Sequence, residues 1–162
     1  MRKTVLTTIA VLAVMLSVVQ VRAQGGPPPY GETINIEAAK KAAAAAAAEA
    51  KKNNWAMCIT VVAPSGDLVY FERMDNCQYA SIVISQHKAR AAATFRRPTK
   101  TFEDRVSQGG AGLAALTLDG IIASDGGVPI VMGGKIVGAI GVSGATGAQD
   151  GQCAKAGVDA VK

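Results

Sequence analysis

Several residue types that build common functional sites are scarce in this chain of 162 residues, which contains one histidine and three cysteines. The cysteines form no C-x-x-C pair, and with a single histidine the sequence has no zinc-ligand spacing pattern. The sequence also has no G-x-G-x-x-G fingerprint, no P-loop and no G-x-S-x-G nucleophile elbow. These absences argue against a zinc site, a nicotinamide site of the Rossmann type, P-loop phosphate binding and α/β-hydrolase chemistry.

The N-terminus has the pattern of a cleaved export signal. Arg2 and Lys3 precede an uncharged and almost wholly apolar run at 5–19, and Val21-Arg22-Ala23 then ends in a small residue. The run holds about 15 residues, fewer than the roughly 20 that a membrane-spanning helix needs. We therefore expect residues 1–23 to be a signal peptide, the mature chain to have no membrane span, and its location to be periplasmic or secreted.

Much of the basic character belongs to this leader. The formal net charge of the whole chain is +5, and removal of Arg2, Lys3 and Arg22, with no acidic residue among 1–23, lowers it to +2. A nucleic-acid-binding domain would be expected to carry a basic patch with interleaved aromatic residues. We therefore expect no nucleic-acid partner.

The remaining sequence predicts a single α+β domain at 35–162, preceded by a flexible Pro/Gly-rich arm at 24–34. Turn residues at 64–67 and 133–134 each separate two β-rich runs and predict two hairpins. The two hairpins favour a mainly antiparallel sheet of about five strands with flanking helices. The helices are expected at 36–53, 79–95, 101–108 and 146–161, and a further short strand at 121–123.

The helix expected at 79–95 carries the candidate site. One stripe along it holds Val83, His87, Arg90 and Thr94. A neutral imidazole is a metal or haem ligand, and an arginine one turn further along can pair with a carboxylate. A solvated polar edge of the helix would produce the same pattern.

A basic cluster follows this helix. Arg96, Arg97, Thr99 and Lys100 surround Pro98 at the expected junction of two helices, where backbone N–H groups add positive potential for an anion. Capping of the next helix by Thr99 or Thr101 would be a purely structural role for the same segment.

Two of the cysteines flank the first expected hairpin. Cys58 and Cys77 could approach each other there, and export would permit a disulfide between them. Two buried thiols explain the same residues equally well.

Several segments between about Asn35 and the C-terminus form a recognisable series, of which 138–145 is the most specific. The others are Asn53-Asn54-Trp55, 61–66, 72–75, Ser81-Ile82, Lys88-Ala89-Arg90, Arg97-Pro98-Thr99 and 126–130. In their order and spacing these segments resemble the GlcG/HbpS family of haem-binding proteins, which is related to the C-terminal domain of PduO-type corrinoid proteins.

The resemblance implies a profilin-like α+β fold, assembly into homo-oligomers, and haem as the cofactor, with a cobalamin-type tetrapyrrole less favoured. It places the haem contacts near Arg97-Pro98-Thr99, so Thr99 is the position carried over. His87 is outside the family pattern, and its assignment as a ligand of the haem iron comes from the helix stripe alone. The residues expected to neutralise the propionates are Arg90, Arg96, Arg97 and Lys100.

We therefore expect an exported haem-binding protein that serves haem storage, scavenging or redox sensing. The alternative is an isomerase- or tautomerase-type enzyme that acts on a small carboxylated metabolite in the same pocket, with His87 as general acid and base. A third possibility is a structural oligomeric partner of an exported dehydrogenase system. Binding is favoured over catalysis, and no catalytic residue is assigned.

The leader generates the first prediction. Protein recovered from the periplasm or the medium should begin at Gln24, because the small residue Ala23 ends the pattern that signal peptidase recognises. Intact-mass measurement of that fraction tests this, and a mass that still includes Met1 would contradict it.

Overall fold

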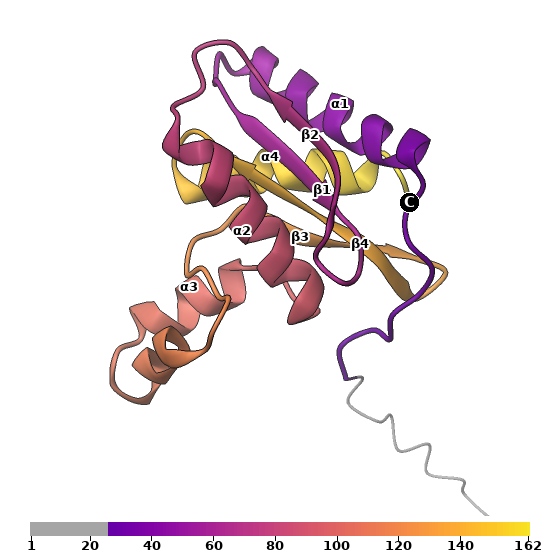
Figure 1. Ribbon diagram of the computed structural model, residues 1–162. Coiled ribbons are helices and arrows are strands. Elements are labelled where there is room, and N and C mark those ends of the chain that lie inside the picture. Colours follow the sequence, from indigo (N-terminus) through magenta and orange to yellow (C-terminus); the bar gives the residue numbers. More distant parts are fainter. Residues whose placement is uncertain (1–25) are drawn as a thin grey trace, which may run out of the picture.

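The computed structural model describes residues 26–162, so the predicted signal peptide at 1–23 lies outside the described residues (Figure 1). None of the helices in this part is long and apolar enough to cross a membrane. In chain order the elements are α1 (Ile36–Lys52), β1 (Cys58–Val62), β2 (Leu68–Arg73), α2 (Ala80–Thr94), α3 (Lys100–Ser107), the 3₁₀ helix η1 (Gly110–Thr117), β3 (Gly127–Met132), β4 (Lys135–Ser143) and α4 (Gly147–Asp159).

The strands form one antiparallel sheet in the order β2-β1-β4-β3, which confirms the α+β class. The sheet has four strands in residues 26–162, so the expectation of about five was wrong by one. The missing strand is the one expected at 121–123, which is irregular. Ile121 lies beside His87 of α2 and lines a hollow there, instead of pairing with an edge strand.

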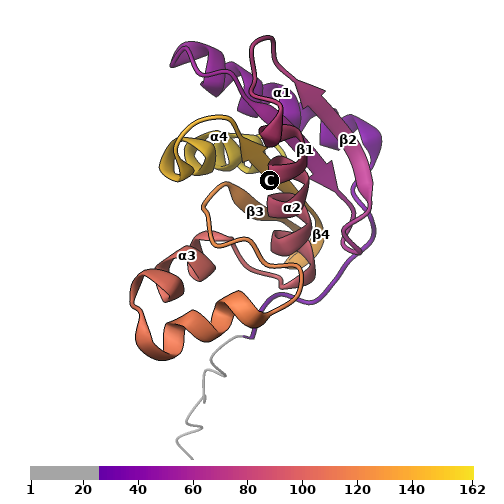
Figure 2. The same ribbon diagram turned by 60° about the vertical axis from the view of Figure 1, so that its left-hand side comes forward.

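Helices cover both faces of the sheet, with α2 on one face and α1 and α4 on the other (Figures 1 and 2). The side chains of the central strand β1 therefore alternate between two cores. Ile59 and Val61 pack with α1 and α4, whereas Val62 packs with alanines of α2. Thr60 lies on the α2 side as well, and its hydroxyl is 2.8 Å from that of Ser85.

Small residues let α1 and α4, which cover the face of the sheet opposite α2, lie close together. Asn35 caps α1 by accepting a hydrogen bond of 2.9 Å from the N–H of Ala38, and every buried residue of this helix is an alanine. A Cβ added to Gly157 of α4 would come within 2.8 Å of the carbonyl oxygen of Ala42. The alanine-rich sequence therefore serves packing against α4.

The end of the Pro/Gly-rich segment lies along β4. Ile136 donates to the carbonyl of Pro29 and accepts from the N–H of Gly31, both at 2.8 Å, and Ile34 donates to Val137 at 2.7 Å. The reason is that β1 pairs with β4 only from Ala139 onward. The first residues of β4 would otherwise have unpaired backbone groups on that side.

A buried ion pair connects α2 to α4. The ammonium of Lys88 lies 2.7 Å from a carboxylate oxygen of Asp150, and the two residues are 1% and 2% exposed. The other carboxylate oxygen of Asp150 accepts from the N–H of Ala145 at 3.1 Å. Burial raises the pKa of Asp150, while the hydrogen bond from Lys88 acts in the opposite direction.

Glycines make room for this pair and for α2. A Cβ on Gly126 would lie 3.0 Å from the Lys88 ammonium and 2.8 Å from Cβ of Asp150. A Cβ on Gly141 would lie 2.1 Å from the carbonyl oxygen of Ser85 in α2. These positions need glycine because a helix or a charged side chain occupies the space of their side chain.

The ion pair generates a stability prediction. Lys88→Met should lower the free energy of unfolding at pH 7 by about 3–5 kcal/mol, because the carboxylate of Asp150 would stay buried without a partner. The loss should shrink as the pH falls, because protonation of Asp150 removes the uncompensated charge and the folded state then binds the extra proton.

Denaturant unfolding measures both effects. Lys155→Met is the matched control, because it breaks an exposed pair with Asp159 and should cost about 0.5 kcal/mol or less. Equal losses for the two variants would show that the buried pair contributes no more than a surface pair.

Candidate functional site

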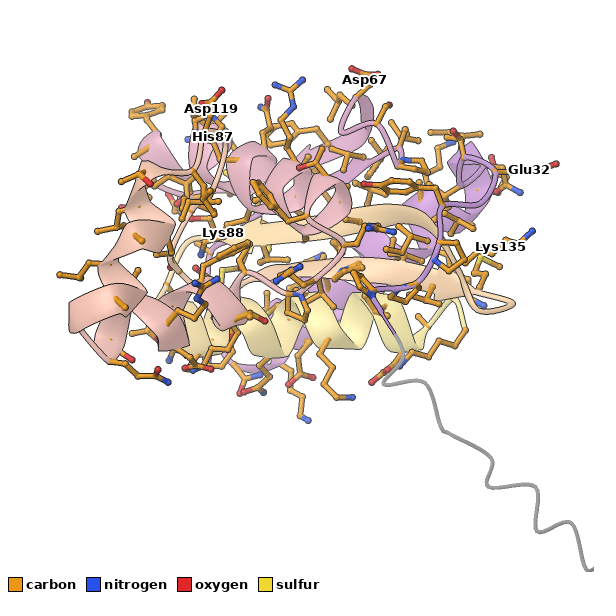
Figure 3. The ribbon with its side chains drawn as sticks, turned by 90° about the horizontal axis from the view of Figure 1, so that it is seen from below. Glu32, Asp67, His87, Lys88, Asp119 and Lys135 are labelled. Atoms are coloured by element: carbon orange, nitrogen blue, oxygen red, sulfur yellow. The ribbon has the colours of Figure 1, made fainter. Side chains whose placement is uncertain are left out.

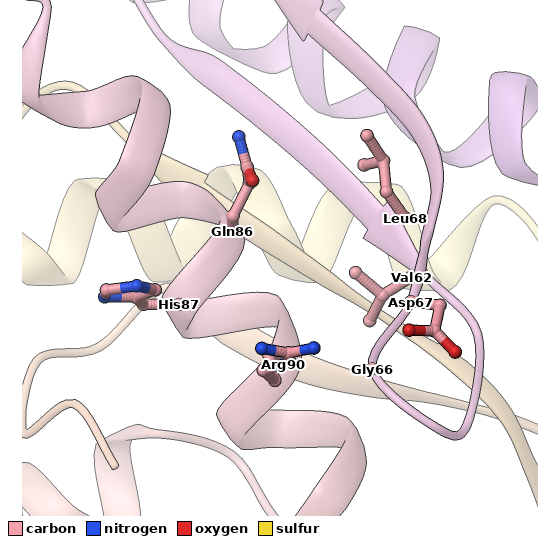
Figure 4. A pocket seen from close by; sticks show the side chains of 7 residues that line it. All are labelled: Val62, Gly66, Asp67, Leu68, Gln86, His87 and Arg90. Carbon is pink, nitrogen blue, oxygen red and sulfur yellow. The ribbon is translucent and has the colours of Figure 1, made fainter. Parts of the chain in front are cut away.

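Two hollows meet at His87 and Arg90 of α2. The first, of about 250 Å³, lies between α2 and the hairpin turn that joins β1 to β2 (Figure 4). The second, of about 560 Å³, lies between the same two residues and the loop that precedes β3. The other residues that line them are Val62, Ser65, Gly66, Asp67, Leu68, Gln86, Asp119, Gly120 and Ile121.

The helix positions both side chains by burying its other faces. Ser85, Lys88 and Ala89 point into the protein, which leaves His87 and Arg90 exposed as the predicted stripe requires. Figure 3 shows His87 at the surface beside Asp119, whereas Lys88, the next residue, lies inside. Adjacent residues of α2 therefore have opposite roles, one at the site and one in the ion pair.

The hairpin turn approaches Arg90 through a glycine. Gly66 has φ of +91°, and a Cβ there would lie 2.9 Å from Cγ of Arg90. Any larger residue would meet both a backbone penalty and a clash with the arginine. The turn at 64–67 thus forms a wall of the first hollow as well as reversing the chain.

The side chains of His87 and Arg90 have no polar partner in the described part of the chain, whereas Ser65 donates a hydrogen bond of 2.7 Å to Asp67 across the turn. Within residues 26–162, the imidazole of His87 makes no hydrogen bond and the guanidinium of Arg90 makes no salt bridge. Two exposed apolar side chains lie near them: Leu68 lines the first hollow and is 57% exposed, and Val83, which is 54% exposed, lies one helical turn before His87 on α2. A nitrogen donor, a cation and exposed apolar surface therefore occur together, and they suit a ligand that is both apolar and anionic.

The structure does not bring the rest of the predicted basic cluster to His87. Arg96 has φ of +55° and turns the chain, and its guanidinium stacks over the ring of Tyr30 at 5.4 Å. Arg97 donates from Nε to the carbonyl of Phe95 at 3.0 Å. Lys100 pairs with Glu103 and Asp104 on its own helix.

Thr99 anchors the helix junction to the sheet. It is 0% exposed, its N–H donates to the carbonyl of Gly127 at 2.9 Å, and its hydroxyl accepts from the N–H of Gly127 at 2.9 Å. The expectation that it caps α3 is wrong, because its side chain makes no capping hydrogen bond and its backbone is already helical. The hydroxyl is bound to β3 and does not line the hollows at His87.

Sequence reasoning missed the residues that the hairpin and the loop contribute. Asp67 belongs to a recognised turn, but a turn motif does not tell which helix lies opposite. Asp119 and Ile121 belong to a segment without periodicity, so no pattern predicted their approach to α2.

Among residues 26–162, no three His, Cys, Asp or Glu side chains are grouped to hold a metal ion. A metal ion bound at this site would therefore need further ligands that these side chains do not supply, such as the nitrogen atoms of a cofactor.

The whole folded domain is similar to known proteins. The model of the family described as "Haem degrading protein HbpS-like" matches residues 34–159. GlcG of Escherichia coli K12 is 46% identical over 94 residues, which cover 58% of this chain and 69% of GlcG.

Two solved structures share the fold. A double mutant of HbpS from Streptomyces reticuli is 31% identical, with a TM-score of 0.74 over 88% of this chain and 96% of that chain. A PduOC–haem complex is 22% identical, with a TM-score of 0.73 over 80% of this chain and 96% of the other, and at this identity it shows the fold alone.

The geometry of Thr99 generates a prediction. Thr99→Val should lower the free energy of unfolding by about 1–3 kcal/mol, because the buried N–H of Gly127 would lose its acceptor while the shape of the side chain is kept. Thr117→Val is the control, since Thr117 is exposed and should change stability by about 0.5 kcal/mol or less. Urea unfolding measures both, and a Thr99 variant as stable as the wild type would refute the anchoring role.

Proposed function

Because the chain belongs to the family of HbpS-like haem-degrading proteins, we propose that it binds haem in the groove formed by the two hollows at His87 and Arg90. One observation supports this site above others: the single histidine of the chain lies exposed where both hollows meet, without a hydrogen-bond partner among residues 26–162. The family is described by haem degradation, and the PduOC structure with the same fold is a haem complex.

The residues present fit the chemistry of haem. The iron accepts a neutral imidazole nitrogen, which His87 offers on the surface of α2. The macrocycle needs apolar contact, which Leu68 and Ile121 offer in the two hollows that His87 lines. The propionates need cations, and Arg90 lies one helical turn from His87 with no acidic partner in the described chain.

The proposal narrows the expected ligand set. His87 would bind the iron and Arg90 a propionate, while Leu68 and Ile121 would exclude water from the two sides of the ring. When bound, haem would supply a redox-active iron. Arg96, Arg97 and Lys100 have other partners, and the hydroxyl of Thr99 is bound to Gly127, so none of these four is assigned to the haem here.

Both hollows are open to the surface, which favours reversible binding. The role that we propose is haem storage, scavenging or redox sensing. We propose further that the protein carries it out as an exported homo-oligomer. The leader at 1–23 supports export, and family resemblance supports oligomerisation.

A second function follows from the size and polarity of the first hollow. Its volume of about 250 Å³ and its lining by Asp67, Gln86, His87 and Arg90 suit a small carboxylate better than a tetrapyrrole. In an isomerase- or tautomerase-type reaction, Arg90 would hold the carboxylate and His87 would move the proton. Turnover of a carboxylated dienol without haem would favour this alternative.

Haem titration of variants tests the proposed site. His87→Ala should shift the Soret band and weaken haem binding at least roughly tenfold, because the iron loses its nitrogen ligand. Arg90→Gln should weaken binding by about three- to tenfold through loss of a charge-assisted bond, with a smaller change of the Soret position.

Arg105→Gln is the matched control for charge, because Arg105 is exposed on α3 and lines neither hollow. It should leave the haem affinity unchanged. Wild-type affinity in both the His87 and the Arg90 variants would place haem elsewhere, and the absence of a Soret shift with wild-type protein would refute haem binding itself.

A further inference from the structure

Two buried cysteine sulfurs meet at the end of the sheet, away from the groove proposed for haem. Sγ of Cys58 lies 2.6 Å from Sγ of Cys77, and both residues are buried. Non-bonded carbon atoms are best placed at about 3.5–4.0 Å, and sulfur is larger than carbon. The backbone thus holds the two sulfurs closer than separate thiols prefer, at a distance approaching that of a covalent bond.

The surrounding backbone holds both cysteines in place. Cys58 begins β1 and pairs with Arg73 of β2 and Ser143 of β4. Cys77 lies in the loop between β2 and α2, where its N–H donates to Met74 at 3.1 Å and its carbonyl accepts from the guanidinium of Arg73 at 3.0 Å. The approach of the sulfurs therefore follows from the fold and not from two mobile side chains.

We infer that Cys58 and Cys77 form a structural disulfide that fastens the loop before α2 to the central strand β1. The bond closes a loop between residues 19 positions apart in the sequence. Its effect on stability comes mainly from restricting the unfolded chain, and it holds the start of the helix that carries His87.

The oxidant is an external disulfide of the glutathione type. The thiolate of one cysteine attacks this disulfide, which gives a mixed disulfide and releases one small thiolate. The second protein thiolate then attacks the protein sulfur of the mixed disulfide and releases the second small thiolate. Two electrons pass from the protein sulfurs to the external disulfide, and the two protons of the cysteines end on the released thiols.

Burial determines when this exchange takes place. Burial, followed by the hydrogen bond with Cys77, raises the pKa of the Cys58 thiol to about 12, so the folded reduced protein holds almost no Cys58 thiolate at neutral pH. The bond therefore forms while the chain folds, when both thiols are still accessible. Once formed, its burial protects it from attack by external thiols.

The third cysteine cannot compete in the folded protein. Cys153 of α4 is buried in the core formed by α1, α4 and the facing side of the sheet, together with Ile59. Successive residues of a strand point to opposite faces, so Cys58 lies on the side of α2. The sheet separates Cys153 from the Cys58–Cys77 pair.

Refolding in a redox buffer tests the inference. The reduced chain is unfolded in guanidinium chloride, diluted into a mixture of reduced and oxidised glutathione, alkylated in denaturant and digested for mass spectrometry. We expect one alkylated cysteine, Cys153, and a cross-linked peptide pair that contains Cys58 and Cys77. The oxidised protein should melt roughly 5–15 °C above the reduced protein.

Matched variants and a kinetic comparison complete the test. Cys153→Ala should retain the cross-link, whereas Cys58→Ala and Cys77→Ala should each abolish it. Oxidised glutathione added to the folded reduced protein should form the bond at least about tenfold more slowly than it forms during refolding. Three alkylated cysteines in a refolded chain with native circular dichroism, stable glutathione adducts, or links to Cys153 would overturn the inference. Equal rates would overturn the route through the unfolded chain.

Discussion

The ion pair between Lys88 and Asp150 is the contact on which the arrangement of the layers depends. It joins α2 to α4, which cover opposite faces of the sheet, and both charges are almost completely buried. A buried charge is tolerated only beside a well-placed partner, so the two helices must take up one relative position. The same position makes His87, the neighbour of Lys88, point outward into the two hollows.

The requirement for small residues follows from this arrangement. α2 lies so close to the sheet that Gly141 faces the backbone of Ser85, and Gly126 faces the charged pair itself. On the other face, the alanines of α1 and Gly157 of α4 allow an equally close approach. At these glycines backbone atoms or the charged pair take the space of a side chain, so a single added carbon atom would disturb the packing. A disulfide between Cys58 and Cys77 and the anchor at Thr99 would fasten the segments before and after α2 to the sheet.

The groove at His87 is assembled from three parts of the chain. α2 supplies the imidazole and the guanidinium, the β1–β2 turn supplies one wall, and the loop before β3 supplies the other. α2 packs on the sheet through its alanines and is joined to α4 by the ion pair, so the proposed ligand-binding groups stand on a helix that is held at two places. Donor groups on a packed helix, beside walls formed by a turn and a loop, suit the reversible binding proposed above.

The four α-helices, the two hairpins, the antiparallel sheet and the outward stripe with His87 and Arg90 could be predicted from the sequence, because these follow from periodicity and turn chemistry over short distances. The segment between α3 and β3 could not, since it contains the 3₁₀ helix η1 and lacks the strand expected at 121–123. The sequence by itself did not determine the partner of Lys88, which is 62 residues away, nor the approach of Asp119 and Ile121 to α2. It also grouped Arg96, Arg97, Thr99 and Lys100 into one anion site, whereas the left-handed turn at Arg96 and the bonds of Thr99 to Gly127 separate them. Local patterns indicate which face of a helix is polar. Tertiary packing determines which charges face each other, which polar groups are paired within the fold, and which stay free to bind a ligand.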